Sequence, residues 1–312
     1  MLTSDDTPRL KETIRKRKYR AGKRRELIDL EAQARRLEAY LAKLQTQHRW
    51  VYVNEHPQKM LSNRPTWMES TLLAHPITRR QGIQWLSERI FHQACRTVPR
   101  DRSLRGQGDK VYTLDVHVSD DIDDEGVTID ALETRYERTE YMDGKRAADE
   151  HWERLLSTQP TITKELIEHM DDRFMYFHHI NHRIGTHILT IAGMLQDDDR
   201  VVITSCFVAK DELFPHGENI MRLHGFAWTI FESLAPYITL VHNLSYHYTP
   251  TLSNGRVIPL EKIGQLFGRS SFGSKHREAY IELIRSTAEA AFIDSHNEID
   301  RQMKARKQRA SH

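Results

Sequence analysis

Ten lysine and arginine residues lie within residues 9–25, together with one acidic residue, Glu12. Cationic side chains at this density neutralise phosphate groups and release the counterions that surround nucleic acid. The segment has a net charge of +9, so the remainder of the chain, whose total is +2, has a net charge of −7. The charge distribution therefore predicts that this segment binds a polyanion. The predicted phosphate contacts are Arg15, Lys16, Arg17, Lys18, Arg20, Lys23 and Arg24.

A leucine repeat follows the cationic segment. Leu30, Leu37 and Leu44 recur every seven residues, and further apolar residues lie between them at steps of three and four. This spacing places the apolar side chains on one helical face that pairs with a second helix. One helix is therefore expected to carry both the cationic segment and a short coiled-coil seam. The seam consists of Leu27, Leu30, Ala34, Leu37, Leu41 and Leu44.

The charges beside this seam argue against simple self-pairing. In a parallel homodimer Glu26 would face Glu31 of the second helix, and His48 interrupts the next seam position. Like charges at these positions are destabilising, and no Asn in the seam specifies a two-stranded pair. The pattern favours a heterodimer over a homodimer. A larger assembly through the rest of the chain and packing of the helix on the protein's own body are the alternatives.

The cationic segment and its leucine repeat resemble the bZIP family. That family places an Arg ten residues before the first zipper Leu, as Arg20 and Leu30 are placed here. The resemblance implies a DNA-binding regulator in which Arg20 is the residue best placed to reach a base. The family's Asn, eight residues before that Arg, is replaced by Glu12. Because phosphates repel a carboxylate, this departure predicts weakened sequence specificity.

Residues 18–41, KYRAGKRRELIDLEAQARRLEAYL, are also similar to the arm of the mating-specific protein family of oomycetes. In that family a degenerate basic-zipper arm precedes a START-like domain. The resemblance covers about residues 15–45 and implies the same architecture here. The expected domains are a basic and zipper helix (1–50), a linker with a connecting helix (51–100) and a START-like domain (101–312). The implied helix-grip fold is a curved antiparallel sheet with a long C-terminal helix.

The pattern beyond the arm independently predicts an α+β body, because several strands precede one long helix. Alternating apolar and polar residues in 111–118 are typical of a half-buried strand. Further strands are expected at 174–180, 186–195, 200–208, 226–231 and 237–248, with a hairpin turn at 196–199. Helices are expected at 77–97, 146–157 and 161–172 and after the loop at 268–274, whereas residues 129–142 are ambiguous.

Folds of this kind place a cavity between the sheet and the last helix, and they resemble carriers of lipids and small apolar ligands. Aromatic side chains on the last strands and the terminal helix are the candidate lining. The candidates are Trp228, Phe231, Tyr246, Tyr248 and Phe292. The alternative is that these aromatics only fill the protein core.

Histidines concentrate in FHHINHRIGTH, where His178, His179, His182 and His187 occur within eleven residues. On a helix, His178 and His182 could share a zinc ion. On the strand predicted here they lie ~13 Å apart, which is too far for one ion. We therefore predict no metal site and no cofactor. No GxSxG, Walker or Rossmann glycine pattern occurs, so no enzyme is predicted.

The two cysteines, Cys95 and Cys206, form neither a disulfide framework nor a CxxC pair. The chain has no apolar leader and no apolar run of membrane-spanning length. We expect the nucleus as its location, with the cytoplasm as an additional one. Two functions remain open. One is a bZIP-like DNA-binding transcriptional regulator. The other is a START-like module for a lipid or small apolar ligand, whose arm binds a partner and not DNA.

Overall fold

The computed structural model describes residues 70–98, 111–119, 126–157, 161–218, 220–270 and 276–310, which belong to one compact unit. The predicted phosphate contacts, Arg15 to Arg24, and the predicted seam, Leu27 to Leu44, lie outside these described residues. No helix in the described ranges is long and apolar enough to cross a bilayer.

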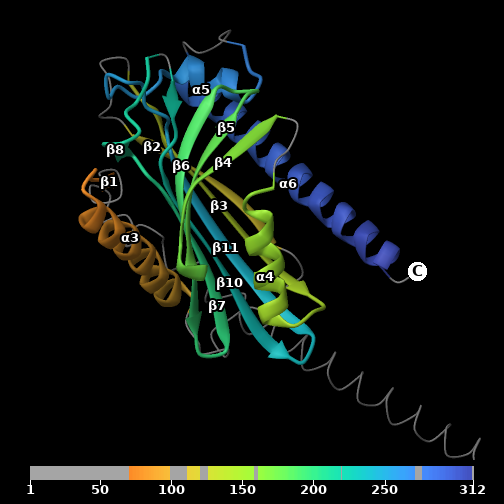
Figure 1. Cartoon of the computed structure of the whole chain (residues 1–312). Helices are drawn as coiled ribbons and strands as arrows, with labels where there is room; N and C mark the ends of the chain where they lie inside the picture. The colour runs from red at the N-terminus through yellow and green to blue at the C-terminus, as the bar shows by residue number, and fades with distance from the viewer. Residues whose placement is uncertain are drawn as a thin grey trace, which may run out of the picture. The chain divides into compact units, whose positions relative to one another are not determined.

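A nine-stranded sheet is the centre of the described part of the chain (Figure 1). Its order is β2-β3-β11-β10-β7-β6-β5-β4, all neighbours are antiparallel, and β9 pairs with β6 in parallel. The strands are β2 (Val111–Ser119), β3 (Thr128–Glu140), β4 (Ile162–Met170), β5 (Phe174–Asn181), β6 (Thr186–Asp197), β7 (Arg200–Phe207), β9 (Met221–Arg222), β10 (Gly225–Ala235) and β11 (Ile238–Tyr248).

The predicted hairpin is confirmed. β6 and β7 pair from Thr190↔Phe207 to Asp197↔Arg200, and the chain reverses at the two residues between them. Asp198 adopts a left-handed conformation (φ 50°), which Asp tolerates better than most residues because its short side chain bonds locally. The strands predicted at 111–118 and 174–180 and the pair at 226–231 and 237–248 are confirmed as β2, β5, β10 and β11.

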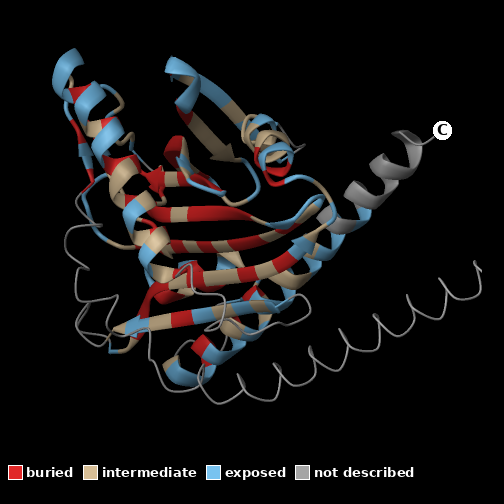
Figure 2. Cartoon of the chain, turned by 90° about the horizontal axis from the view of Figure 1, so that it is seen from below, coloured by how far each residue is buried: buried red, intermediate tan, exposed pale blue. Residues whose placement is uncertain are grey.

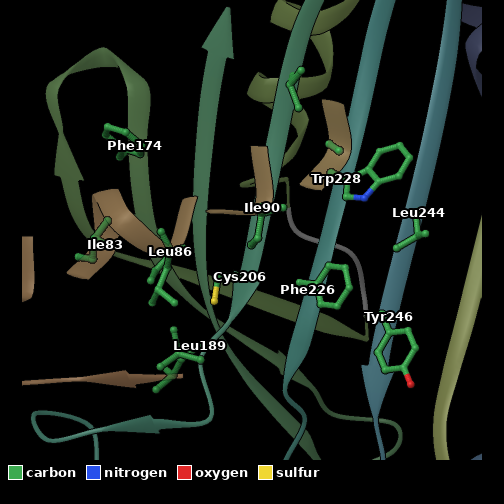
Figure 3. Packing of buried hydrophobic residues seen from close by; sticks show 14 of the residues in the cluster. Ile83, Leu86, Ile90, Phe174, Leu189, Cys206, Phe226, Trp228, Leu244 and Tyr246 are labelled. Atoms are coloured by element: carbon green, nitrogen blue, oxygen red, sulfur yellow. The ribbon is translucent and has the colours of Figure 1, made fainter. Parts of the chain in front are cut away.

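Helix α3 (Pro76–Thr97) covers one face of the sheet, over β6, β7 and β10. Its proline lies in the first turn, where no backbone N–H is needed. Ile83, Leu86 and Ile90 recur at helical spacing and are buried, and they pack with Phe226 and Trp228 of the sheet (Figure 3). This cluster forms the largest part of the core.

The opposite face of the sheet is covered by other helices. Helix α4 (Gly144–Arg154) packs on β7, β10 and β11, helix α6 (Arg277–Ala310) packs on β2 and β3, and the short α5 (Leu260–Leu266) packs on β3. Phe231, Val241 and Tyr136 pack between the sheet and α4, with Phe292 of α6 at the edge of the same cluster. Buried residues therefore lie along the strands, between helices whose outer faces are exposed (Figure 2). The structure confirms the α+β class, with a large antiparallel sheet and a C-terminal helix.

The helix predicted at 161–172 is wrong, since Ile162–Met170 forms strand β4 and Asp171–Arg173 forms a single 3-10 turn. The pairing with β5 shifts between Leu166 and Glu168, so Ile167 is an extra residue in the strand. A bulge of this kind interrupts the alternation of side chains and imitates helical spacing. The ambiguous segment 129–142 is mostly strand β3, and the helix predicted at 146–157 is α4.

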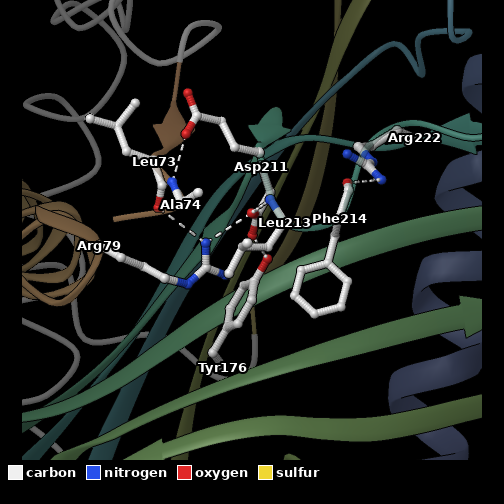
Figure 4. Close-up of polar contacts among 9 residues, drawn as sticks. Leu73, Ala74, Arg79, Tyr176, Asp211, Leu213, Phe214 and Arg222 are labelled. Carbon is white, nitrogen blue, oxygen red and sulfur yellow. Dashed lines mark hydrogen bonds and ion pairs between the residues drawn. The ribbon is translucent and has the colours of Figure 1, made fainter. Parts of the chain in front are cut away.

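A buried ionic network links Arg79, in the first turn of α3, to Asp211, which is distant in the sequence (Figure 4). Both guanidinium Nη atoms of Arg79 donate to the Asp211 carboxylate, at 2.8 and 2.7 Å, and Tyr176 Oη donates to it at 2.5 Å. Burial opposes ionisation of Asp211, but these hydrogen bonds and one from Leu213 N outweigh it and hold the pKa of Asp211 below its usual value. Two short parallel strands, β1 (Thr71–Leu72) and β8 (Lys210–Asp211), pair beside this network.

Candidate ligand-binding site

A cavity of about 420 Å³ lies beside helices α5 and α6, and we call it the α5–α6 cavity. The sheet contributes Ile129 and Leu132 of β3 and His247 and Tyr248 of β11. The helices contribute side chains from α5, from the turn after it and from α6, including Ile263, Leu266, Phe267, Thr287 and Ala291. The volume falls within the range of small-molecule pockets, which are mainly apolar with a few polar groups.

Tight packing between α5 and α6 fixes this wall of the cavity. Tyr280 of α6 is buried against α5 and donates a hydrogen bond to the Ser270 carbonyl oxygen at 2.8 Å. Gly264 allows this approach, because a Cβ atom at that position would lie 2.0 Å from the Tyr280 hydroxyl oxygen. Ile263, Ile281 and Ile284 fill the space between the two helices and β3.

His247 supplies an imidazole ring to the cavity wall. It stacks on Phe207 of β7 with 4.8 Å between ring centroids, and its Nε2 lies 2.8 Å from Ser245 Oγ. Gly225 of β10 lies between these two residues in the sheet, at φ 143°, and a Cβ atom there would lie 2.0 Å from the Tyr246 carbonyl oxygen. Burial, reinforced by His179 and His224, lowers the pKa of His247 to about 4. The ring is therefore neutral near pH 7.

The charged and the amide side chain of the cavity lie toward its exposed side, whereas the polar side chains of Thr186 and Thr249 are buried. Arg183, in the turn between β5 and β6, and Gln265 of α5 are both exposed, whereas Ile129, Tyr248 and Ile263 are buried. Since His247 is neutral and the buried lining is mainly apolar, the cavity suits a molecule with an apolar body. A polar end of such a molecule would lie near Arg183.

The structure separates the five aromatic residues predicted to line a cavity. Tyr248 lines the α5–α6 cavity. Trp228 and Tyr246 lie in the core cluster under α3, and Tyr248 also belongs to that cluster, with its ring centroid 5.0 Å from that of Tyr246. Phe231 belongs to the cluster near α4, and Phe292 packs at the edge of that cluster, against Tyr112. Sequence reasoning missed the lining from α5 and from the turn residues Arg183 and Ile184, for which the sequence carries no signal.

The histidine cluster is divided between a strand and a turn. His178 of β5 lies 3.0 Å from His187 of β6 across the pair, whereas His182 lies in the turn and contacts Thr163 Oγ1 at 2.7 Å. His182 is therefore not on the strand that we predicted to carry it together with His178. Within the described ranges, no three His, Cys, Asp or Glu residues form a group that could hold a metal ion.

No protein-family model and no curated protein matches the chain. Several solved structures are similar to it. Human StAR-related lipid transfer protein 5 is 13% identical, with a TM-score of 0.39 over 67% of this chain and 97% of that chain. Human STARD10 is 10% identical, with a TM-score of 0.35 over 64% of this chain and 84% of that one. The lipid transfer and protein localization domain of human StarD13 (DLC2) is 10% identical, with a TM-score of 0.32 over 52% and 77%. None of these comparisons bears on the bZIP or oomycete resemblance, which stays a prediction.

Proposed function

We propose that this part of the chain is a binding module that holds a small, largely apolar ligand in the α5–α6 cavity. The observation that supports the proposal is the cavity of about 420 Å³, whose buried lining is mainly apolar. Its neutral His247 adds a polar surface without adding a charge. We further propose that the module holds its ligand without changing it chemically.

A cavity-filling variant tests this proposal. Ala291 lines the cavity from α6, so Ala291→Trp would place an indole ring in the ligand's space. The neutral fluorescent probe N-phenyl-1-naphthylamine is expected to bind the wild-type protein and to bind this variant about ten-fold more weakly or worse, a loss of about 1.4 kcal/mol. Fluorescence titration measures the affinity, and native mass spectrometry of the purified protein reveals any retained ligand.

The matched control is Ala290→Trp, on the same helix and exposed but outside the cavity lining. It adds the same ring to the same turn, so the probe should bind this variant as it binds the wild type. Equal binding by Ala291→Trp and the wild type would contradict the proposed site, as would a failure of the wild type to bind any apolar probe.

The basic and leucine pattern of residues 9–44 supports a second proposal, that the arm binds DNA as a dimer. Replacing Leu30 and Leu37 by Asp places charges in the predicted seam, so it is expected to abolish assembly and DNA binding together. Fluorescence anisotropy with palindromic and random duplexes across a salt series measures binding. Tight binding retained by the double variant would refute the zipper. Equal affinity of the wild type for all duplexes would leave only nonspecific phosphate contacts.

A further inference from the structure

A second cavity, of about 840 Å³, lies beside β9 and the residues that follow it, on the side of this segment opposite the α5–α6 cavity. We call it the Arg222 groove, because Arg222 and His224 line it whereas Leu223 between them lines the α5–α6 cavity. The pairing of β9 with β6 and two backbone hydrogen bonds between Arg222 and Thr251, each 2.9 Å, hold the segment in this orientation.

The Arg222 side chain is a cation in an unusual environment. The residue is only 5% exposed, and its Nη2 donates to the Phe214 carbonyl oxygen at 3.1 Å (Figure 4). Among the described residues, no carboxylate forms an ion pair with it, and its buried Nε has no hydrogen-bond partner. A buried charge is costly unless an opposite charge or hydrogen bonds compensate for it.

The two acidic side chains of the groove have hydrogen-bond partners of their own, and the charge of Asp211 only partly offsets the burial that lowers the pKa of Arg222. Both oxygens of Asp211 accept hydrogen bonds from Arg79, and Glu212 Oε2 accepts one from Ala74 N at 2.6 Å. His224 lines the same groove, is 3% exposed, and has a buried Nδ1 that no described group contacts by a hydrogen bond. Lys210 adds a second, exposed cation.

We propose that the Arg222 groove binds a phosphate group, with the guanidinium of Arg222 as the main contact and His224 and Lys210 beside it. A planar guanidinium donates two parallel hydrogen bonds to a phosphate, and this pairing is strong where water is excluded. The phosphate belongs either to a free small molecule or to a lipid headgroup. The site is distinct from the α5–α6 cavity, so the proposal of a phosphate site does not depend on the proposal of an apolar ligand.

The test compares Arg222→Gln with Arg256→Gln, which removes the same charge from an exposed residue outside the groove lining. Calorimetric titration with inorganic phosphate tests the free ligand, and flotation with phosphatidylcholine vesicles, with and without phosphatidic acid, tests the headgroup. Loss of Arg222 is expected to weaken phosphate binding about ten-fold or more, while Arg256→Gln binds as the wild type does. The same pattern seen only with phosphatidic acid vesicles supports the headgroup source.

Equal binding by Arg222→Gln and the wild type would overturn the proposal, as would a wild-type protein that binds neither phosphate nor these vesicles. Thermal unfolding checks that the variant is folded, and because the substitution removes a buried charge we expect no fall in its unfolding temperature without phosphate. If the variant does not fold, phosphate binding is tested instead by NMR of the histidine imidazole signals of the wild-type protein. Phosphate that shifts the His224 and His216 signals but not those of His151, on α4, supports the site, and any other pattern overturns it.

Discussion

Replacing Asp211 by alanine is expected to lower the free energy of unfolding by about 3–5 kcal/mol, because it leaves a buried cation without its partner. The Asp211 side chain is fully buried, and that of Arg79 is 7% exposed. The substitution also removes the acceptor for the Tyr176 hydroxyl group. Urea denaturation followed by tryptophan fluorescence measures the loss.

Two variants serve as controls for this effect. Arg80, next to Arg79 in α3, pairs with Asp171 at 3.2 Å, but both side chains are more than half exposed. Arg80→Ala should therefore cost less than about 1 kcal/mol. The double variant Arg79→Met/Asp211→Leu removes both charges, so it should be more stable than Asp211→Ala alone. If Asp211→Ala lost no more stability than Arg80→Ala, the ion pair between Arg79 and Asp211 would not contribute to stability as we infer.

The protein is expected to lose stability between pH 7 and pH 5. Burial lowers the pKa of His224 to about 4, well below its ordinary value. As the pH falls from about 6.5 toward 4, the unfolded chain therefore takes up a proton that the folded chain does not, which favours unfolding. The contribution of this one residue to stability is about 2 kcal/mol smaller at pH 5 than at pH 7.

Three further histidines act in the same direction. Burial lowers the pKa of His151 to about 3 and the pKa values of His179 and His247 to about 4. Urea denaturation at pH 7, 6 and 5 measures how steeply the free energy of unfolding falls as the pH is lowered. His224→Gln should make this slope shallower. An identical slope for His224→Gln and the wild type would contradict the prediction, because it would mean that folding does not lower the pKa of His224.

Elements whose residues follow one clear period could be predicted from the sequence. Alternation along residues 111–118 and the acidic turn between β6 and β7 indicate strands, and helical spacing of Ile83, Leu86 and Ile90 indicates α3. These local patterns suffice because each element presents one face to the core. Strand β4 could not be predicted in this way, because its bulge interrupts the period.

The candidate sites could be predicted far less well. Trp228 and Phe231 lie on one strand and three residues apart, so alternation places them on opposite faces of the sheet. The sequence does not say which face receives α3 and which receives α6, since that depends on contacts between distant segments. The same applies to Arg222, whose partners Phe214 and Thr251 are not adjacent to it in the sequence and are brought to it by the fold.

The strand order also determines when the sheet can become complete during synthesis. Strand β3 pairs with β11, so Ala131 of β3 has no partner until Tyr248 of β11 has been synthesised. Strands β4 to β7 are connected to β3 only through β10 and β11. A nascent chain that has not yet released residues 225–248 from the ribosome therefore holds two separate groups of strands. Each group has an unpaired edge, on β3 and on β7, and such edges recruit other chains. The final hairpin of the sheet thus ends the interval in which the growing chain is most exposed to aggregation.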